Sequence, residues 1–306
     1  MNYPYANGTI KALETKVLDR NKLLVLAKYD KTEFVKVLLA MNYGSEGTTL
    51  EEVIASEKHR VRTLIDSITP SKEDTNLFYL VNDAQNLKLI YKIKKYDLNR
   101  LDLIDDNGTI KKEDLIDAVI NHQYNNLTKS EKDLINILDE KVEETNNPKI
   151  LSAIIDNTIY NYALKKTKNH ILRKYLTIKI DVTNIISMMR SKNLNWDYPE
   201  YESMIIDGGI VTKDKLKNMY GLDSENRIKT LEPYYEGHLA KTLKEVESIA
   251  NIEILFDRFI ISEMAKYKDD PFTIGPMIYY YLLKLSEAQN VRLIYSNTNI
   301  ELKNLI

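Results

Sequence analysis

The feature that most constrains the fold of this chain is a short pattern that occurs three times, about one hundred residues apart. Residues 7–11 read NGTIK and recur unchanged at 107–111, and residues 207–210 read DGGI at the same offset. Each copy has a glycine where a turn would open a helix. Self-similarity over such an interval predicts one structural unit per copy. We therefore take the glycines as the first anchor of a repeat: Gly8, Gly108 and Gly208.

Two further anchors follow the glycines in an order that never changes. The second is an acidic residue that we expect near a helix start: Glu51, Asp156 and Asp257. The third is an asparagine three residues after an acid: Asn86, Asn184 and Asn290. The constant order predicts three consecutive repeats, which we place at residues 1–106, 107–206 and 207–306. The asparagines predict repeated hydrogen bonds between helices, because a buried amide needs partners; contact with a partner at a shared rim is the other interpretation.

Signals for helices run along almost the whole chain. Only 9 glycines and 7 prolines interrupt its 306 residues. Thr49 with Glu52 predicts a capping box, and Pro70 marks the end of that helix. Pro276 suits the first turn of a final helix over 277–295. The stretch 176–182 alternates partly like a strand, but its spacing also fits a helix, and we interpret it as helical. The expected class is therefore all-α.

The positions of the first and last anchors predict how the repeats close. The first glycine lies almost at residue 1, and the last asparagine helix ends almost at residue 306. The third repeat is therefore complete only if the N-terminal helices, within 1–44, pack beside the C-terminal ones. An open solenoid would instead need a polar cap at each end. We predict three pseudo-repeats of helices that close into a pseudo-threefold funnel.

Composition argues against several classes of function. The formal net charge of −2 argues against a broad nucleic-acid surface. The absence of cysteine excludes disulfides, thiolate metal sites and thiol nucleophiles. The four histidines form no ligand motif, and no phosphate-binding loop or nucleophile elbow occurs. We expect no catalytic residue, no cofactor and no metal. No apolar run approaches the length of a membrane span, and no signal peptide is visible.

One basic stretch is a candidate partner-facing patch. It comprises Lys165, Lys166, Lys168, Arg173 and Lys174. A solvated helix face is the usual explanation for such a run. A surface that meets an acidic partner or anionic headgroups is the alternative.

Several stretches resemble one known family. They are Tyr3-x-Tyr5, IKALE at 10–14, DGGI at 207–210, and the closing stretch YYLLKLxExQNVRLI at 280–294. Together they resemble the C-type subunit of the V-type and A-type rotary ATPases, whose eukaryotic counterpart is the d-type subunit. The resemblance covers essentially the whole chain. The family usually has a Lys-Glu-x-Glu run before the asparagine, where this chain has Leu285 and Ser286.

The resemblance implies a mechanical function. Members of that family are all-helical funnels, peripheral to the membrane, on the cytoplasmic face of the proteolipid ring. They receive the foot of the central shaft, made of D- and F-type subunits, and turn with both. The expected function is non-catalytic coupling of shaft and ring in ATP-linked transport of protons or sodium ions.

Two other hypotheses come from different classes. A free helical adaptor would bind partner helices in a groove lined by exposed apolar side chains. An enzyme would bring carboxylates such as Glu51, Asp156 and Asp257 together in one cavity with perturbed pKa values. Threefold placement argues against the enzyme, because it separates the three acids.

Overall fold

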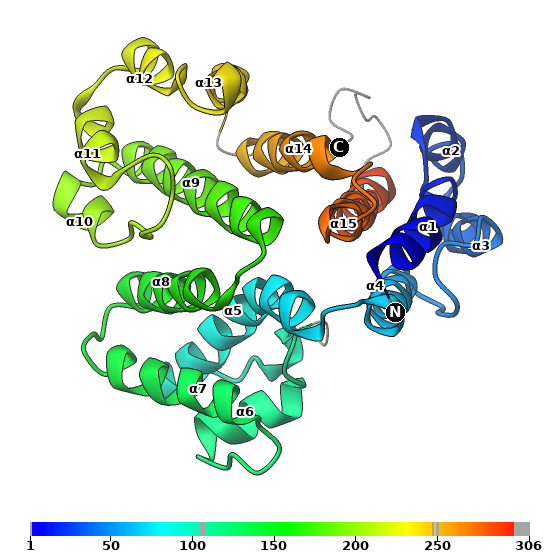
Figure 1. Cartoon of the computed structure of the whole chain (residues 1–306), viewed down its shortest axis with the longest axis horizontal. Coiled ribbons are helices and arrows are strands. Elements are labelled where there is room, and N and C mark those ends of the chain that lie inside the picture. The colour runs from blue at the N-terminus through cyan, green and yellow to red at the C-terminus, as the bar shows by residue number, and fades with distance from the viewer. Residues whose placement is uncertain (1, 105–107, 247, 249–250, 297–306) are drawn as a thin grey trace. The chain divides into compact units, whose positions relative to one another are not determined.

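The computed structural model describes residues 2–104, 108–246, 248 and 251–296 (Figure 1). Over these residues the chain forms helices and turns without any strand, so the prediction of an all-α protein is confirmed. The helices belong to two compact units. One is formed by residues 1–72 with 253–306, and the other by residues 73–252.

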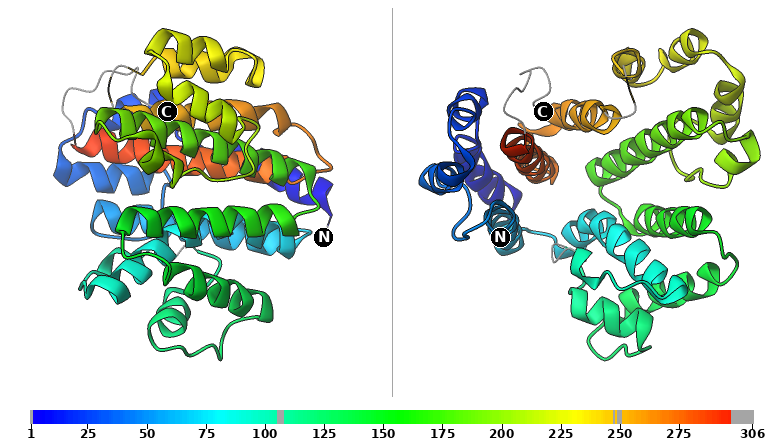
Figure 2. Two further views of the ribbon diagram at one scale, coloured as in Figure 1. Left: turned by 90° about the vertical axis from the view of Figure 1, so that its left-hand side faces the viewer. Right: turned by 180° about the vertical axis from the view of Figure 1, so that it is seen from behind.

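The first unit joins both ends of the chain. Its helices are α1 (Tyr3–Glu14), α2 (Arg20–Leu26), α3 (Lys31–Ala40), α4 (Leu50–Ile68), α14 (Ile252–Met264), the 3-10 helix η3 (Ala265–Tyr267) and α15 (Gly275–Ser296). Helix α15 contacts α1, α2 and α4 (Figure 2). Leu38, Val53 and Val291 are fully buried in their shared core. Truncating any of them to alanine costs about 1 to 5 kcal/mol of unfolding free energy.

Local sequence explains where these helices start and stop. The Thr49–Glu52 capping box opens α4, as predicted, and the helix ends two residues before Pro70. Asp30 accepts hydrogen bonds from the N–H groups of Thr32 and Glu33 and caps α3. Pro276 lies in the first turn of α15, where its missing N–H costs no helical hydrogen bond.

The second unit holds the remaining helices. They are α5 (Lys72–Tyr96), η1 (Leu101–Leu103), α6 (Lys112–Ile120), α7 (Lys129–Val142), α8 (Pro148–Lys166), α9 (His170–Asn193), α10 (Tyr198–Glu202), α11 (Lys213–Gly221), α12 (Ser224–Leu231), η2 (Tyr235–Gly237) and α13 (His238–Lys244). Residues 176–182 lie within α9, so their interpretation as helical is confirmed. Leu138, Ile155 and Leu176 are fully buried in this unit.

Two expectations about the anchors are wrong. Gly8 lies inside α1 and not in a turn. Its position is exposed, where a helical glycine costs only about 0.5 to 1 kcal/mol relative to alanine. Asp156 and Asp257 lie inside α8 and α14, and only Glu51 stands in the first turn of its helix.

Candidate functional site

Three threonines mark the turns that precede the three long helices α5, α9 and α15. The Oγ1 atom of each accepts a hydrogen bond from the backbone N–H two residues later. The pairs are Thr69 with Ser71 at 3.3 Å, Thr167 with Asn169 at 3.1 Å, and Thr273 with Gly275 at 3.2 Å. In all three copies a buried acid follows the threonine by 14 residues: Asp83, Asp181 and Glu287. This spacing was readable in the sequence, but the sequence analysis missed it.

Each of these acids accepts hydrogen bonds from the backbone of a segment that precedes a short helix. Asp83 accepts from the N–H groups of Thr109 and Ile110, at 2.9 and 3.4 Å. Asp181 accepts from Ile210 and Val211, at 3.1 and 3.0 Å. We call this contact the clamp. Buried carboxylates satisfy backbone donors with strong, charge-assisted hydrogen bonds, so the clamp fixes where the next helices begin.

The third clamp joins the two ends of the chain. Glu287 on α15 accepts a hydrogen bond from the backbone N–H of Leu18. Leu18, Ile110 and Val211 are all buried, and each stands two residues before a helix: α2, α6 and α11, respectively. They are therefore equivalent positions in the three clamps.

The clamp corrects the register of the glycine anchor. A Cβ atom at Gly108 would lie 2.0 Å from Oδ1 of Asp83, and one at Gly209 would lie 2.0 Å from Oδ1 of Asp181. Only glycine allows such a close approach of backbone and carboxylate. Gly108 is thus equivalent to Gly209 and not to Gly208. Asn107, which shares the NGTIK identity, lies outside the described residues.

The asparagine anchors are buried in all three copies: Asn86, Asn184 and Asn290. The Asn184 amide donates to the carbonyl of Ile206 at 2.9 Å and accepts from its N–H at 2.8 Å. A two-point contact of this kind satisfies the amide without water. In this copy the asparagine binds the segment between helices rather than a neighbouring helix.

The acids of the second anchor have separate partners. Lys88 on α5 pairs with Asp156 on α8 at 2.8 Å, inside the second unit. Arg292 on α15 holds Glu51 on α4 through both of its carboxylate oxygens, inside the first unit. Lys88 and Arg292 each stand five residues after a clamp acid, so the two ion pairs are equivalent.

Burial sets the electrostatics of these two ion pairs apart. Desolvation raises the pKa of Asp156, against the opposing effect of Lys88. The hydrogen bonds from Arg292 lower the pKa of the exposed Glu51. Asp257 has a different partner, because Gln289 donates a hydrogen bond to it at 3.0 Å. Each of the three acids therefore has its own structural partner.

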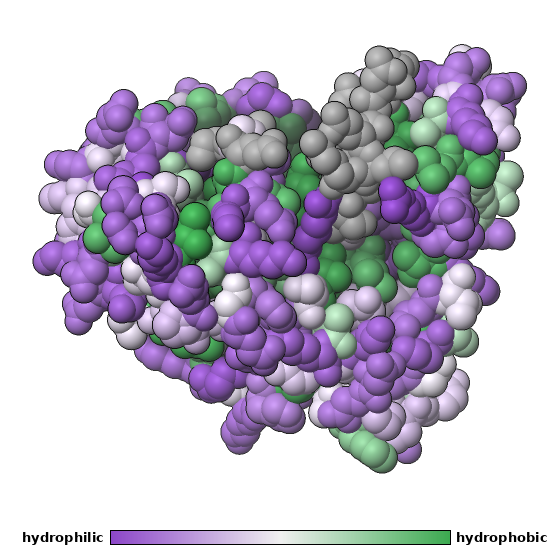
Figure 3. Space-filling model, turned by 90° about the horizontal axis from the view of Figure 1, so that it is seen from above, coloured by the Kyte–Doolittle hydropathy of each residue, from purple (hydrophilic) through white to green (hydrophobic). Residues whose placement is uncertain are grey.

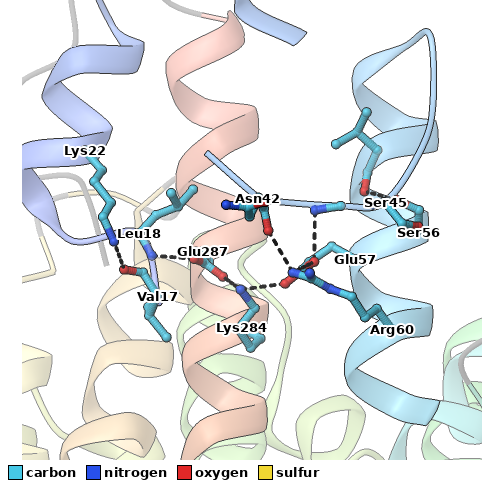
Figure 4. Close-up of polar contacts among 12 residues, drawn as sticks. Val17, Leu18, Lys22, Asn42, Ser45, Ser56, Glu57, Arg60, Lys284 and Glu287 are labelled. Atoms are coloured by element: carbon cyan, nitrogen blue, oxygen red, sulfur yellow. Dashed lines mark hydrogen bonds and ion pairs between the residues drawn. The ribbon is translucent and has the colours of Figure 1, made fainter. Parts of the chain in front are cut away.

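The third copy contains a buried ion network, which no pattern in the sequence analysis identified (Figure 4). Lys284, only 8% exposed, lies between Glu57 and Glu287 and is 2.7 Å from Oε1 of Glu57. Glu57 also accepts from the N–H of Gly44 at 2.9 Å and pairs with Arg60. Through Leu18, whose N–H binds Glu287, the network connects α15 and α4 with the segment before α2.

The charges in this network balance. Burial raises the pKa of Glu287, while Lys284 opposes that shift. The aromatic ring of Tyr43 lies 5.0 Å from the Lys284 ammonium, and burial raises the pKa of its own hydroxyl. Two carboxylates and two cations leave the site without net charge. The other copies have Leu80 and Ile178 where the third has Lys284, so this network is specific to the third repeat.

Asp181 also binds a side chain. In addition to two backbone N–H groups it accepts a hydrogen bond from the hydroxyl of Tyr235. Burial nevertheless raises the pKa of Asp181 to about 6. Tyr235 stands with Glu236 and Gly237 in a run of three positive φ values, of 51°, 57° and 81°. The hydroxyl contact therefore holds a strained turn against α9.

The structure divides the predicted basic patch. Arg173 donates to the carbonyls of Leu164 and Thr167, at 2.8 and 3.1 Å, and so closes the turn between α8 and α9. The Lys174 and Lys166 ammonium groups lie over the rings of Tyr235 and Tyr162, at 5.0 and 5.5 Å. Lys165 and Lys168 are exposed to solvent. Part of the stretch is therefore structural, and Lys165 and Lys168 remain at the surface.

Among the described residues, no group of three or more His, Cys, Asp or Glu side chains could hold a metal ion. The described helices also include none that is long and apolar enough to cross a membrane.

Comparison with known proteins shows the family. Residues 6–298 match the family model of the ATP synthase (C/AC39) subunit. The C-type subunit of the A-type ATP synthase of Methanosphaera stadtmanae is 25% identical, and the alignment covers 95% of this chain and 83% of that protein. The corresponding A-type ATP synthase subunits of Thermococcus onnurineus and Methanococcoides burtonii are 24% and 22% identical, with 95% and 96% of this chain covered and 85% and 89% of the relatives. The chain therefore belongs to the ATP synthase (C/AC39) subunit family, whose members are subunits of rotary ATPases.

Proposed function

We propose that this chain is the rotor subunit that couples the central shaft to the membrane proteolipid ring of a V/A-type ATPase. Its partners are then the D- and F-type shaft subunits and the ring, and it lies on the cytoplasmic face as a peripheral, non-catalytic component. Membership of the C/AC39 family supports this proposal. The three repeats would close into the pseudo-threefold funnel expected from the sequence.

The clamp is the observation that carries the mechanical part of the proposal. A coupler passes torque only if it is stiff, because a soft body stores twist. Here each long helix is tied to the start of a further set of helices by a buried acid: Asp83, Asp181 and Glu287. The contact of Glu287 with Leu18 also ties the two ends of the chain together. Interiors packed in this way have low compressibility and transmit strain.

Native mass spectrometry tests the proposal. The tagged chain is purified from its own cells in mild detergent. The proposal predicts co-purification with a proteolipid oligomer and shaft subunits, at one copy of this chain per assembly. A lone chain, with an intact ring and shaft found elsewhere in the same extract, would contradict it. That outcome would favour a free adaptor, and the purified chain should then bind isolated amphipathic helices added to it.

A further inference from the structure

The turn before α15 differs from its two counterparts in length. Helix α4 ends at Ile68 and α5 begins at Lys72, and α8 ends at Lys166 and α9 begins at His170. In the third repeat η3 and residues 268–274 separate α14 from α15. The extra residues include Asp269, Asp270, Pro271 and Phe272. We call residues 269–273 the acidic turn.

Phe272 points into solvent from this turn. It is 72% exposed, the largest exposed fraction among the exposed large apolar side chains of the described residues. Ile68, which stands in the same place before its threonine, is buried. Hydrophilic side chains cover most of the face drawn in Figure 3. Phe272 therefore buries little of its side chain within its own unit, and most of the side chain is available to a partner.

The acidic turn is held in place by a buried amide. Asn7 of α1 is only 5% exposed, and its Nδ2 donates to the carbonyls of Pro271 and Thr273 at 3.0 and 2.9 Å, with a longer contact of 3.4 Å to Asp270. The Asp270 carboxylate accepts from the N–H of Phe272 at 3.0 Å. Lys11 pairs with Asp269 at 2.7 Å. These contacts hold the backbone on both sides of Phe272, so the point from which its side chain projects is set before any partner arrives.

We propose that the acidic turn is a docking foot, in which Phe272 inserts between basic cytoplasmic loops of the proteolipid ring. This inference rests on the proposed function and names the surface by which the chain meets the ring. Cytoplasmic loops of membrane proteins are rich in lysine and arginine. Lys11 already pairs with Asp269, so the Asp270 carboxylate beside the aromatic anchor supplies the negative charge that complements such loops. Pre-organisation by Asn7 lowers the entropy lost on docking.

The test measures binding of the full chain to two separate probes, the detergent-solubilised proteolipid ring and the isolated shaft subunits. Phe272→Ala is expected to weaken binding to the ring tenfold or more, as loss of an aromatic anchor does, and to leave shaft binding unchanged. Tyr29→Ala is the matched control, because Tyr29 is also exposed, lies in the same unit and stands outside the turn. It should change neither affinity.

Asn7→Ala tests the positioning role of the amide. It leaves Phe272 intact but removes its support, so it should weaken ring binding and leave the shaft affinity unchanged. Thermal melting of Phe272→Ala should match that of the parent chain, which separates docking from folding. Phe272→Tyr keeps an aromatic side chain of similar shape and should retain most of the affinity for the proteolipid ring.

The outcomes separate this inference from the proposed function. If the parent chain binds neither probe, the coupling function itself fails. If the parent chain binds the ring and Phe272→Ala binds it equally well, only the docking foot is wrong. Weakened shaft binding with unchanged ring binding would assign the acidic turn to the shaft and also overturn the inference.

Discussion

The backbone N–H of Leu18 donates a hydrogen bond to the buried carboxylate of Glu287, a residue near the other end of the chain. The same carboxylate pairs with Lys284, which in turn pairs with Glu57. One network thus links α4, α15 and the segment before α2. The proposed coupling function depends on such links, because they make the N-terminal and C-terminal helices one body.

Replacing Lys284 should break this network. Lys284→Met leaves the carboxylates of Glu57 and Glu287 close together without their shared cation. Removing one partner from a buried ion network typically costs about 3 to 5 kcal/mol of unfolding free energy. Urea denaturation measures the loss. Lys36→Met, at an exposed position on α3, is the control and should change stability by no more than about 0.5 kcal/mol. Equal stability of both variants would show that the network contributes nothing.

The glycines of the clamp can be tested against a glycine outside it. Gly209→Ala places a Cβ atom 2.0 Å from the Asp181 carboxylate, so either the backbone or the clamp must move. We expect a loss of about 1 to 3 kcal/mol or more, as for other overpacked sites. Gly8→Ala meets nothing within 4 Å inside α1 and should stabilise the chain by about 0.5 to 1 kcal/mol. Thermal melting of both variants checks the opposite signs, and a stabilised Gly209→Ala variant would refute the clamp geometry.

Asp181 should make stability depend on pH. Its pKa is about 6 in the folded chain and 3.8 in the unfolded reference. The folded state therefore binds more protons between these values, and the contribution of this group to stability falls as pH rises from about 4 to about 6. Asp181→Asn removes the titration. Urea denaturation across this range should show the parent chain losing stability relative to the variant as pH rises. A constant or opposite difference would contradict a raised pKa for the buried Asp181.

The two equivalent ion pairs should differ in strength. Lys88 and Asp156 are both mostly buried, whereas Arg292 and Glu51 are largely exposed. Lys88→Met should cost about 3 kcal/mol or more, since it leaves a buried carboxylate unpaired. Arg292→Leu should cost no more than about 1 kcal/mol, because solvent screens an exposed pair. Denaturant melts of the two variants compare them directly. Equal losses would mean that burial does not set the strength of these pairs.

Much of the fold was predictable because local rules decide it. The Thr49–Glu52 box and Pro276 identify helix starts through hydrogen bonds within a few residues of each other. The all-α class followed from the same rules. Gly8 shows where a pattern failed, since residues 8–11 lie inside a helix and the identical residues 108–111 precede one. Identical short peptides take different structures when tertiary contacts differ: Gly108 has a clamp acid against its Cα, and Gly8 does not.

The candidate site was less predictable because its contacts are distant in sequence. Nothing local indicates that Lys284 meets Glu57, or that Asn7 holds the turn before α15. The threonine-to-acid spacing was visible in the sequence, but its meaning depends on the backbone donors that fold onto Asp83 and Asp181. Composition and periodicity identify buried faces, and they do not identify which buried groups meet.

The most direct test of the coupling account is ATP-driven ion uptake by vesicles that contain the reconstituted ATPase, assembled with and without this chain. The account predicts that omitting the chain abolishes uptake while the catalytic head continues to hydrolyse ATP, because the shaft then turns without the ring. Adding the chain back should restore uptake. Uptake that persists at the full rate in its absence would contradict the role of this chain as the link between shaft and ring.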